Sequence, residues 1–175
     1  MAKLEVLTAP HPILNQVAQP VDEVDNNIRK IMDDMLETMY HETGVGLAAN
    51  QVGILKRIIV IDLKDDDEEI REKGFYPLFM ANPEIIQISD DSEEEIEGCL
   101  SVPEQRVAVT RPQHVKVKYL DYNNKKQEID ARGWFARAVQ HEIDHLNGKL
   151  MINYLSKLKK DIILRKLIKL KRNAA

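Results

Sequence analysis

Residues 140–150 read Gln-His-Glu-Ile-Asp-His-Leu-Asn-Gly-Lys-Leu, and this stretch sets the expected fold. Apolar residues recur around it at spacings of three and four, which predicts a helix, and Gly148 is a natural stop just beyond. These apolar residues are Ala136, Val139, Ile143 and Leu146. On such a helix His141 and His145 lie one turn apart on one face, where both imidazoles can bind one metal ion, with Glu142 beside them. Two imidazoles and a carboxylate can activate a water molecule, although a bare His-x-x-x-His pair is more common on ordinary surface helices.

A third metal ligand is needed, because a catalytic site usually takes three protein ligands and leaves one position open for water. The segment after His145 contains no Glu and only one Asp, Asp161, so the gluzincin protease pattern is not completed. The position of the third His in the metzincin pattern holds Met151. Upstream lies the only cysteine of the chain, Cys99, next to Gly98. A lone Cys is more often a small buried hydrophobe, but beside His-Glu-x-x-His it is the best available ligand. One Cys and two His suit Zn, Fe(II), Ni or Co.

Three short motifs follow one another along the chain. Gly44–Gln51 reads Gly-Val-Gly-Leu-Ala-Ala-Asn-Gln, Glu97–Ser101 reads Glu-Gly-Cys-Leu-Ser, and Gln140–His145 reads Gln-His-Glu-Ile-Asp-His. Together they resemble the motifs of the peptide deformylase family, and the length is similar to that of the bacterial form. The resemblance implies a metal-dependent hydrolase that removes the formyl group from the N-terminal formylmethionine of nascent polypeptides and releases formate. It also implies Fe2+ as the physiological ion, one per chain, with Ni2+ or Zn2+ able to substitute.

The resemblance assigns roles to individual residues. Cys99, His141 and His145 would bind the metal, and Glu142 would act as the general acid and base. The Gln51 side-chain amide and the Leu100 backbone N–H would stabilise the oxyanion. The implied substrate-binding residues are Val45, Gly46, Glu97, Gly98, Trp134, Arg137 and Ala138. Arg137 departs from the family, which commonly has an apolar residue there. Its long side chain is expected either to reach solvent over its methylenes or to alter the pocket rim.

Length and composition set limits on the class of protein. The chain has 175 residues with 43% hydrophobic content, which suits one core and a single domain spanning 1–175. A secretion leader and a run of about eighteen apolar residues are both missing, so neither secretion nor membrane spanning is expected. One cysteine cannot form an internal disulfide, which fits a reducing cytoplasm. The net charge of -4 indicates no particular partner, and neither DNA nor a membrane is expected.

The first half of the chain predicts an extended start, a helix and a strand. Pro10, Pro12 and Pro20 indicate an extended or turning opening segment. Asp25 is the expected N-cap of a helix whose methionine-rich face packs in the core. That face comprises Ile28, Ile31, Met32, Met35, Leu36 and Met39. The β-branched run Ile58–Ile61 predicts a buried strand.

The acidic middle of the chain predicts two exposed segments around a strand pair. The charged residues of 64–74 indicate an exposed loop. A strand pair broken at Asn82-Pro83 is expected within 78–89. Residues 90–95 then return the chain to solvent, so Cys99 is expected to emerge from a surface loop into a strand-like segment.

The remaining strands precede the metal-bearing helix. Residues 106–109 and 115–119 alternate as half-buried antiparallel strands do. Asn123-Asn124 predicts a turn that returns the chain through 127–130 as a hairpin, and the helix is expected to begin just after Gly133. This order, without β-α-β alternation, predicts an α+β fold. Antiparallel sheets would pack around the metal-bearing helix, with an N-terminal packing helix and a C-terminal helix.

The C-terminal segment predicts a basic amphipathic helix. Residues 156–172 contain eight basic residues and one acidic residue. An apolar stripe of Leu158, Ile162, Leu167 and Ile168 is expected to dock on the body of the protein. The basic face would then be solvated, or it would contact ribosomal RNA near the exit tunnel, because clustered Lys and Arg attract phosphate backbones.

Two rival functions remain open from the residues alone. A zinc endopeptidase is suggested by His-Glu-x-x-His and predicts cleavage of internal peptide bonds. A structural metal module predicts a site that only stabilises the fold. Substitution of Glu142 by Ala separates them, because a structural site would lose nothing and either enzyme would lose turnover.

Overall fold

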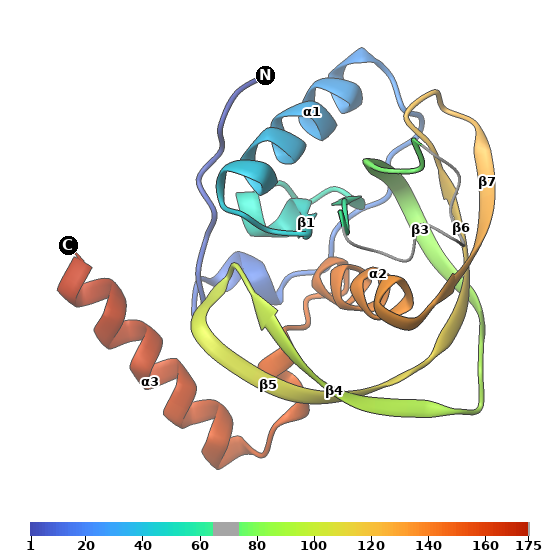
Figure 1. Cartoon of the computed structure of the whole chain (residues 1–175). Coiled ribbons are helices and arrows are strands. Elements are labelled where there is room, and N and C mark those ends of the chain that lie inside the picture. Colours follow the sequence, from blue (N-terminus) through green and yellow to red (C-terminus); the bar gives the residue numbers. More distant parts are fainter. Residues whose placement is uncertain (65–73, 175) are drawn as a thin grey trace.

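The computed structural model describes residues 1–64 and 74–174 and has the predicted α+β class (Figure 1). Five antiparallel strands form one sheet in the order β1-β2-β3-β6-β7, and two more form a separate β4-β5 ribbon. The sheet strands are β1 (Gly46–Ala48), β2 (Ile58–Ile61), β3 (Leu78–Ile88), β6 (His114–Leu120) and β7 (Lys126–Arg132). The ribbon strands are β4 (Ser92–Cys99) and β5 (Val102–Pro112). The helices are α1 (Asn26–His41), α2 (Gly133–Leu146) and α3 (Lys157–Ala174), with short 3-10 turns at Pro12–Asn15, Ala49–Val52 and Met151–Tyr154.

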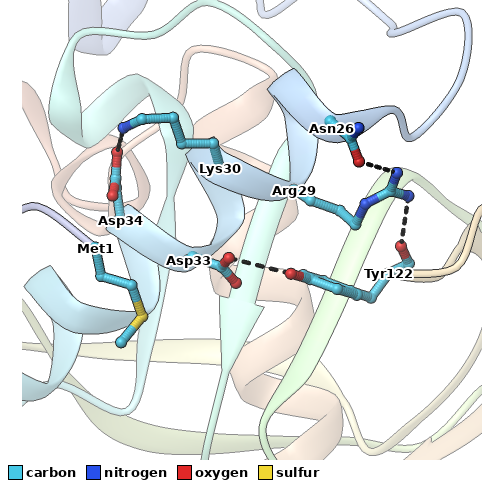
Figure 2. A pocket seen from close by; sticks show the side chains of 7 residues that line it. All are labelled: Met1, Asn26, Arg29, Lys30, Asp33, Asp34 and Tyr122. Carbon is cyan, nitrogen blue, oxygen red and sulfur yellow. Dashed lines mark hydrogen bonds and ion pairs between the residues drawn. The ribbon is translucent and has the colours of Figure 1, made fainter.

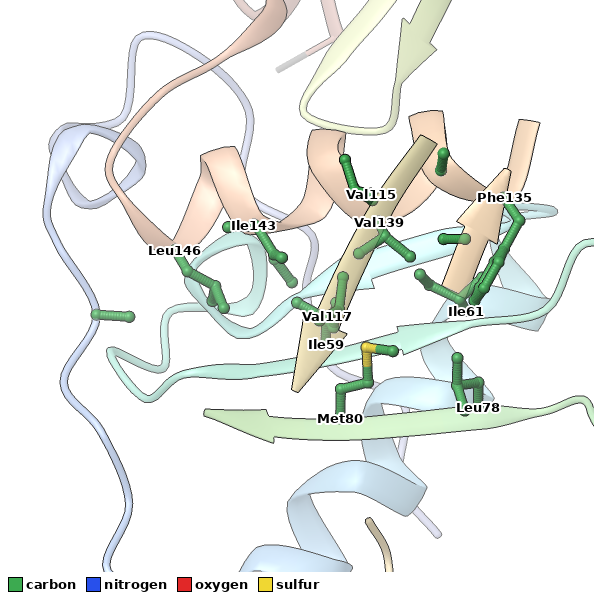
Figure 3. Packing of buried hydrophobic residues seen from close by; sticks show 14 residues of the cluster. Ile59, Ile61, Leu78, Met80, Val115, Val117, Phe135, Val139, Ile143 and Leu146 are labelled. Carbon is green, nitrogen blue, oxygen red and sulfur yellow. The ribbon is translucent and has the colours of Figure 1, made fainter. Parts of the chain in front are cut away.

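Helix α2 lies at the centre of the fold because its apolar face packs on the five-stranded sheet. Val139, Ile143 and Leu146 are buried, and Figure 3 shows them directed toward strand residues that include Ile59 and Val117. These are positions of the predicted periodicity, so the helix prediction is confirmed. Because the apolar face is committed to the sheet, the polar residues of α2 face the other way, toward the β4-β5 ribbon.

Helix α1 covers a second part of the core. Its predicted N-cap is confirmed, since the Asp25 carboxylate accepts a hydrogen bond from Ile28 N at 2.9 Å. Met32, Met35 and Met39 are fully buried against β1 and β2, as the methionine-rich face predicted.

The outer face of α1 is tied by polar contacts around a pocket of about 260 Å³ (Figure 2). Lys30 Nζ lies 2.8 Å from Asp34 Oδ2, and the Tyr122 hydroxyl donates to Asp33 at 3.1 Å. Arg29 donates to Asn26 Oδ1 at 2.6 Å. Of these contacts the one from Tyr122 crosses to α1 from the turn between β6 and β7, and Arg29 Nη1 adds a second by donating to the Tyr122 carbonyl oxygen at 3.4 Å.

The expected break at Asn82-Pro83 is a bulge inside one strand, so the predicted strand pair is wrong. Strand β3 continues through both residues, and its register to β6 shifts between Ala81 and Glu84. Pro83 has no N–H to give to the ladder, and Asn82 adopts a φ of +50°. The Asn82 side-chain amide bonds both the N–H and the carbonyl of Val21 at 2.8 Å, which stabilises the irregular backbone.

The acidic segment before Cys99 is also different from the prediction. Cys99 lies in a strand as expected, but it is the last residue of β4, and the loop expected before it is already part of this strand, which begins at Ser92. Glu93 and Glu94 are exposed as expected and Glu95 is partly buried, but the backbones of all three pair with β5. A charged ribbon strand has no apolar alternation, because both faces at this end are solvated. The loop predicted at 64–74 lies almost entirely outside the described residues.

Helix α3 forms as predicted, but of the four residues in its expected docking stripe only Leu167 is buried. Leu158 is 72% exposed, while Leu167 is 3% exposed. Ile162 and Ile168 are exposed as well. Leu167 packs with Ile163, Leu164 and a third core cluster that includes residues of β5 and the 3-10 turn after α2. The helix thus docks by a narrow edge and extends away from the body (Figure 1). Among the helices described, none is long and apolar enough to cross a membrane.

Candidate metal centre

The site forms where the β4-β5 ribbon runs alongside α2 (Figure 1). Helix α2 contributes His141 and His145, which are buried, and the end of β4 contributes Cys99, which is partly buried. The ribbon is long enough to carry Cys99 back across the polar face of α2, because β4 and β5 pair from Ser92–Pro112 to Cys99–Val102. Residues more than forty positions apart in sequence are thereby placed together.

The three predicted ligands converge. One ligand atom from each of Cys99, His141 and His145 lies within 4.8 Å of the others. Cys99 Sγ is 3.4 Å from His145 Nε2, and the two imidazole ring centres are 5.1 Å apart. A tetrahedral ion with a metal–sulfur bond of ~2.3 Å and a metal–nitrogen bond of ~2.05 Å would separate sulfur and nitrogen by ~3.5 Å. The spacing of Cys99 and His145 therefore fits a shared ion.

Glu97 orients His141. Its Oε1 lies 2.8 Å from His141 Nδ1, while Arg111 donates Nε to Oε2 at 2.6 Å and Nη2 to Oε1 at 2.9 Å. Burial alone would raise the pKa of Glu97, but Arg111 and His141 lower it to about 2. The carboxylate is thus an acceptor only, so Nδ1 carries the proton and Nε2 is free to bind a metal ion.

Arg111 connects this carboxylate to a second one. It donates Nη1 to Asp144 Oδ2 at 2.9 Å, and the Tyr154 hydroxyl donates to the same oxygen at 2.6 Å. Sequence reasoning missed Arg111. The signal was present, because Arg111 continues the buried alternation of Val107 and Val109 along β5.

Glu142 has a free carboxylate oxygen beside the ligands. Its Oε2 is buried and has no hydrogen-bond partner among residues 1–64 and 74–174, while Oε1 lies 3.8 Å from His141 Nε2. Burial raises the pKa of Glu142 to about 7, even though His141 acts in the opposite direction. Burial and, to a smaller extent, the charge of His141 lower the pKa of His145. The lowered pKa favours the neutral imidazole, which is the form that binds a metal ion. The chain therefore places next to the metal ligands a base, Glu142, whose pKa is near neutrality.

Gln51 presents its amide nitrogen to the same centre. Its Oε1 accepts from Ala48 N at 2.9 Å, and its Nε2 lies 3.0 Å from Ser101 Oγ and 3.6 Å from Cys99 Sγ. These contacts fix which end of the amide faces the sulfur. Ser101 was not singled out from the sequence, although it ends the second motif and is fully buried.

A cavity of about 800 Å³ opens onto these groups, and we call it the metal-site cavity. Its walls include the following residues predicted for catalysis, substrate binding or metal binding: Val45, Gly46, Gln51, Glu97, Gly98, Cys99, Leu100, Trp134, Arg137, Ala138, His141 and Glu142. Val45 and Trp134 are about half exposed, which places apolar surface within reach of solvent. Arg137 does not extend into solvent, because it is buried and its guanidinium bonds to Glu97. All predicted site residues except His145 thus line one cavity, and His145 lies at the ligand cluster itself.

These residues fit a divalent transition-metal ion. One thiolate and two imidazoles form the donor set, Glu97 fixes the tautomer of one imidazole, and the unpaired oxygen of Glu142 lies alongside. Three protein ligands alone fit either a catalytic ion or a structural one. The cavity gives a substrate access to the ligands from solvent, which favours the catalytic ion.

Comparison with known proteins identifies the family. Residues 3–161 match the family described as polypeptide deformylase. The chain is 58% identical over 173 residues to a peptide deformylase from Rickettsia akari and 60% identical to one from Rickettsia canadensis, each covering 99% of both chains. A crystal structure of peptide deformylase from Ehrlichia chaffeensis superposes with a TM-score of 0.92 at 43% identity, covering 99% of both chains. The chain therefore belongs to the polypeptide deformylase family, as its three motifs predicted.

Proposed function

We propose that this chain is a metal-dependent hydrolase that removes the formyl group from the N-terminal formylmethionine of newly synthesised polypeptides and releases formate. Family membership over nearly the whole chain supports this reaction. The observation that carries the mechanism is the unpaired oxygen of Glu142 beside the cluster of Cys99, His141 and His145 in an open cavity. Residues 1–175 would act as one catalytic domain in the cytoplasm, where such substrates are made.

The proposed ligands are Cys99, His141 and His145, and the proposed ion is Fe2+, with Ni2+ or Zn2+ able to replace it. When bound, such an ion acts as a Lewis acid that activates water and polarises the formyl carbonyl. Thiolate on ferrous iron is readily oxidised. Protein loaded with Fe2+ should therefore lose activity in air faster than protein loaded with Ni2+, and equal loss would argue against thiolate ligation of iron.

Glu142 would transfer the proton during hydrolysis. Its carboxylate accepts a proton from the attacking water and passes it to the amine nitrogen as the carbon–nitrogen bond breaks. A pKa of about 7 suits both transfers, because the group then loses and gains a proton readily near neutral pH. Gly46 leaves room for this group, since a Cβ at residue 46 would lie 3.1 Å from the Glu142 carboxyl.

The oxyanion would receive hydrogen bonds from the Gln51 side-chain amide and the Leu100 backbone N–H. The contacts of Gln51 with Ala48 and Ser101 support this assignment, because they hold Nε2 toward the cluster before substrate arrives. Loss of one such donor typically costs about 2.7 to 4 kcal/mol of transition-state stabilisation.

The metal-site cavity would hold the first residues of the substrate. Val45, Trp134 and Ala138 offer apolar surface for the methionine side chain, and Gly46 and Gly98 allow the substrate backbone to approach closely. Glu97 and Arg137 also line this cavity, with their charged groups bonded to each other.

Ribosome contact through α3 is a further part of this proposal. The eight basic residues of 156–172 would bind phosphates of ribosomal RNA near the exit tunnel. Sedimentation with ribosomes should weaken when residues 157–175 are removed and should fall as salt rises. Unchanged binding by the truncated chain would count against this contact.

Formate release from a formyl-methionyl tripeptide tests the reaction directly. The metal-loaded chain should release formate and leave casein intact, whereas casein cleavage would favour the endopeptidase alternative. Glu142→Ala should bind one metal ion per chain and lose about 10²- to 10⁴-fold in kcat. The exposed Glu128 offers a matched control, and Glu128→Ala should retain full activity. Full activity in Glu142→Ala would refute the assignment of Glu142 as the group that transfers the proton.

A further inference from the structure

Arg137 makes three hydrogen bonds to three separate parts of the β4-β5 ribbon. Its Nη1 donates to Glu97 Oε2 at 2.7 Å and to the carbonyl oxygen of Val109 on β5 at 2.8 Å. Its Nη2 donates to the carbonyl oxygen of Glu93 on β4 at 2.7 Å. The residue is 7% exposed, and its guanidinium carbon lies 5.9 Å from the ring centre of Trp134. Arg137 of α2 is thus buried against the ribbon and bonded to both of its strands.

The bond to Glu97 reaches a metal ligand through one carboxylate. Oε2 of Glu97 accepts from Arg137 and from Arg111, while Oε1 accepts from Arg111 and lies against His141 Nδ1. Four donors therefore surround two oxygens, which fixes the carboxylate plane. Any rotation of Glu97 that breaks the contact with Arg137 also moves the acceptor of His141.

The two hydrogen bonds from Arg137 to backbone carbonyls affect a second metal ligand, Cys99. Cys99 follows Glu97 by two residues on β4, so the position of this strand against α2 determines where the sulfur lies. Glu93 and Val109 are on the neighbouring strands, and Arg137 holds the carbonyl of each. Arg111 fastens the ribbon to α2 at a different place, through Asp144.

We infer that Arg137 is a positioning residue for the metal centre, which sets Glu97 against His141 and holds the strand that carries Cys99 against α2. This role differs from the substrate contact expected for residue 137, and it rests on the proposed function only in assuming that the three ligands bind a metal ion. Partners of ligating histidines typically contribute 10- to 100-fold to metal affinity.

Substitution with Met and with Lys separates this role from the alternatives. Arg137→Met keeps a long apolar side chain and loses all three hydrogen bonds. Arg137→Lys keeps a charge that can reach Glu97, but one ammonium cannot reproduce the planar fork that bonds Glu97, Val109 and Glu93 together. Arg132 is exposed at the end of β7 and does not line the metal-site cavity, so Arg132→Met is the matched control.

The test is the affinity of each purified full-length chain for Ni2+, measured by competition with a chromogenic chelator. Arg137→Met is expected to bind Ni2+ roughly 10- to 100-fold more weakly, with an intermediate value for Arg137→Lys and no change for Arg132→Met. At saturating Ni2+, kcat for a formyl-methionyl tripeptide should fall while KM changes little. A raised KM with unchanged Ni2+ affinity would overturn the inference in favour of substrate contact.

Two further outcomes complete the design. Unchanged Ni2+ affinity with only a lowered melting temperature would show that Arg137 merely stabilises the fold, and would also overturn the inference. If Arg137→Met does not fold, the decision passes to Arg137→Lys, whose Ni2+ affinity must fall for the inference to stand. Failure of the proposed function is distinguishable, because a wild-type chain that binds Ni2+ without releasing formate leaves the affinity comparison intact.

Discussion

Adding one methyl group to Gly46 tests where the Glu142 carboxylate lies. A Cβ there would be 3.1 Å from Cδ and Oε1 of Glu142 and 3.2 Å from its Cγ. Carbon atoms in contact prefer about 3.5 to 4.0 Å, so the carboxylate must shift by roughly half an ångström. Because a misplacement of about 1 Å can cost about 10²-fold in rate, Gly46→Ala should lower kcat about tenfold. Overpacking should also lower the free energy of unfolding by about 1 to 3 kcal/mol.

Gly98 provides the matched control for this substitution. A Cβ at residue 98 would meet nothing nearer than Arg106 Nη1 at 4.0 Å among the described residues, yet Gly98 lines the same cavity. Gly98→Ala should therefore leave the free energy of unfolding and kcat nearly unchanged and raise KM, because its methyl group competes with the substrate backbone. Steady-state kinetics at saturating metal and urea unfolding measure both variants. Unchanged kcat in Gly46→Ala, or equal losses of kcat in the two variants, would refute the proposed place of Glu142.

Two other predictions concern stability. Leu167→Ala should lower the free energy of unfolding by about 2 to 4 kcal/mol because Leu167 is 3% exposed. Leu158→Ala should change it by less than about 0.5 kcal/mol because Leu158 is 72% exposed, and equal effects in urea unfolding would contradict the observed docking of α3. Acid should also destabilise the chain through Glu97, whose pKa is lowered from 4.5 to about 2. This stabilisation is present above the unfolded pKa and is lost as pH falls from 4.5 toward 2, for a total of roughly 3 kcal/mol. Urea unfolding measured between about pH 5 and pH 3 should show a shallower loss in Glu97→Gln, and parallel curves would contradict the assignment.

The elements that pack in the core were predictable from their apolar periodicity. Helix α2 and the buried strand Ile58–Ile61 occur where the pattern indicates, because the helix buries one apolar face and the strand is buried on both faces. The same reasoning failed for β4, since the three consecutive acidic residues Glu93 to Glu95 pair through their backbones without any apolar alternation. It also failed for the bulge at Asn82, which is stabilised by Val21, a residue far away in sequence.

The metal ligands could be predicted from the sequence, but the charged residues that orient them could not. Cys99 was identified because it is the only cysteine, and the motifs indicated its partners. The carboxylate of Glu97 and the guanidiniums of Arg111 and Arg137 meet only because β4, β5 and α2 come together in three dimensions. Charged residues read from sequence alone are usually solvated, so a buried network of them gives almost no local signal.

Cobalt substitution tests the metal centre most directly. A cysteine thiolate bound to Co2+ gives a strong near-ultraviolet charge-transfer band, and in this chain only Cys99 can supply that thiolate. One Co2+ per chain and a clear band are predicted for the wild-type chain and for Glu142→Gln. In Cys99→Ala the band should be lost. A band that persists without Cys99, or a folded wild-type chain that binds no Co2+, would contradict the assignment of Cys99, His141 and His145 as the ligands.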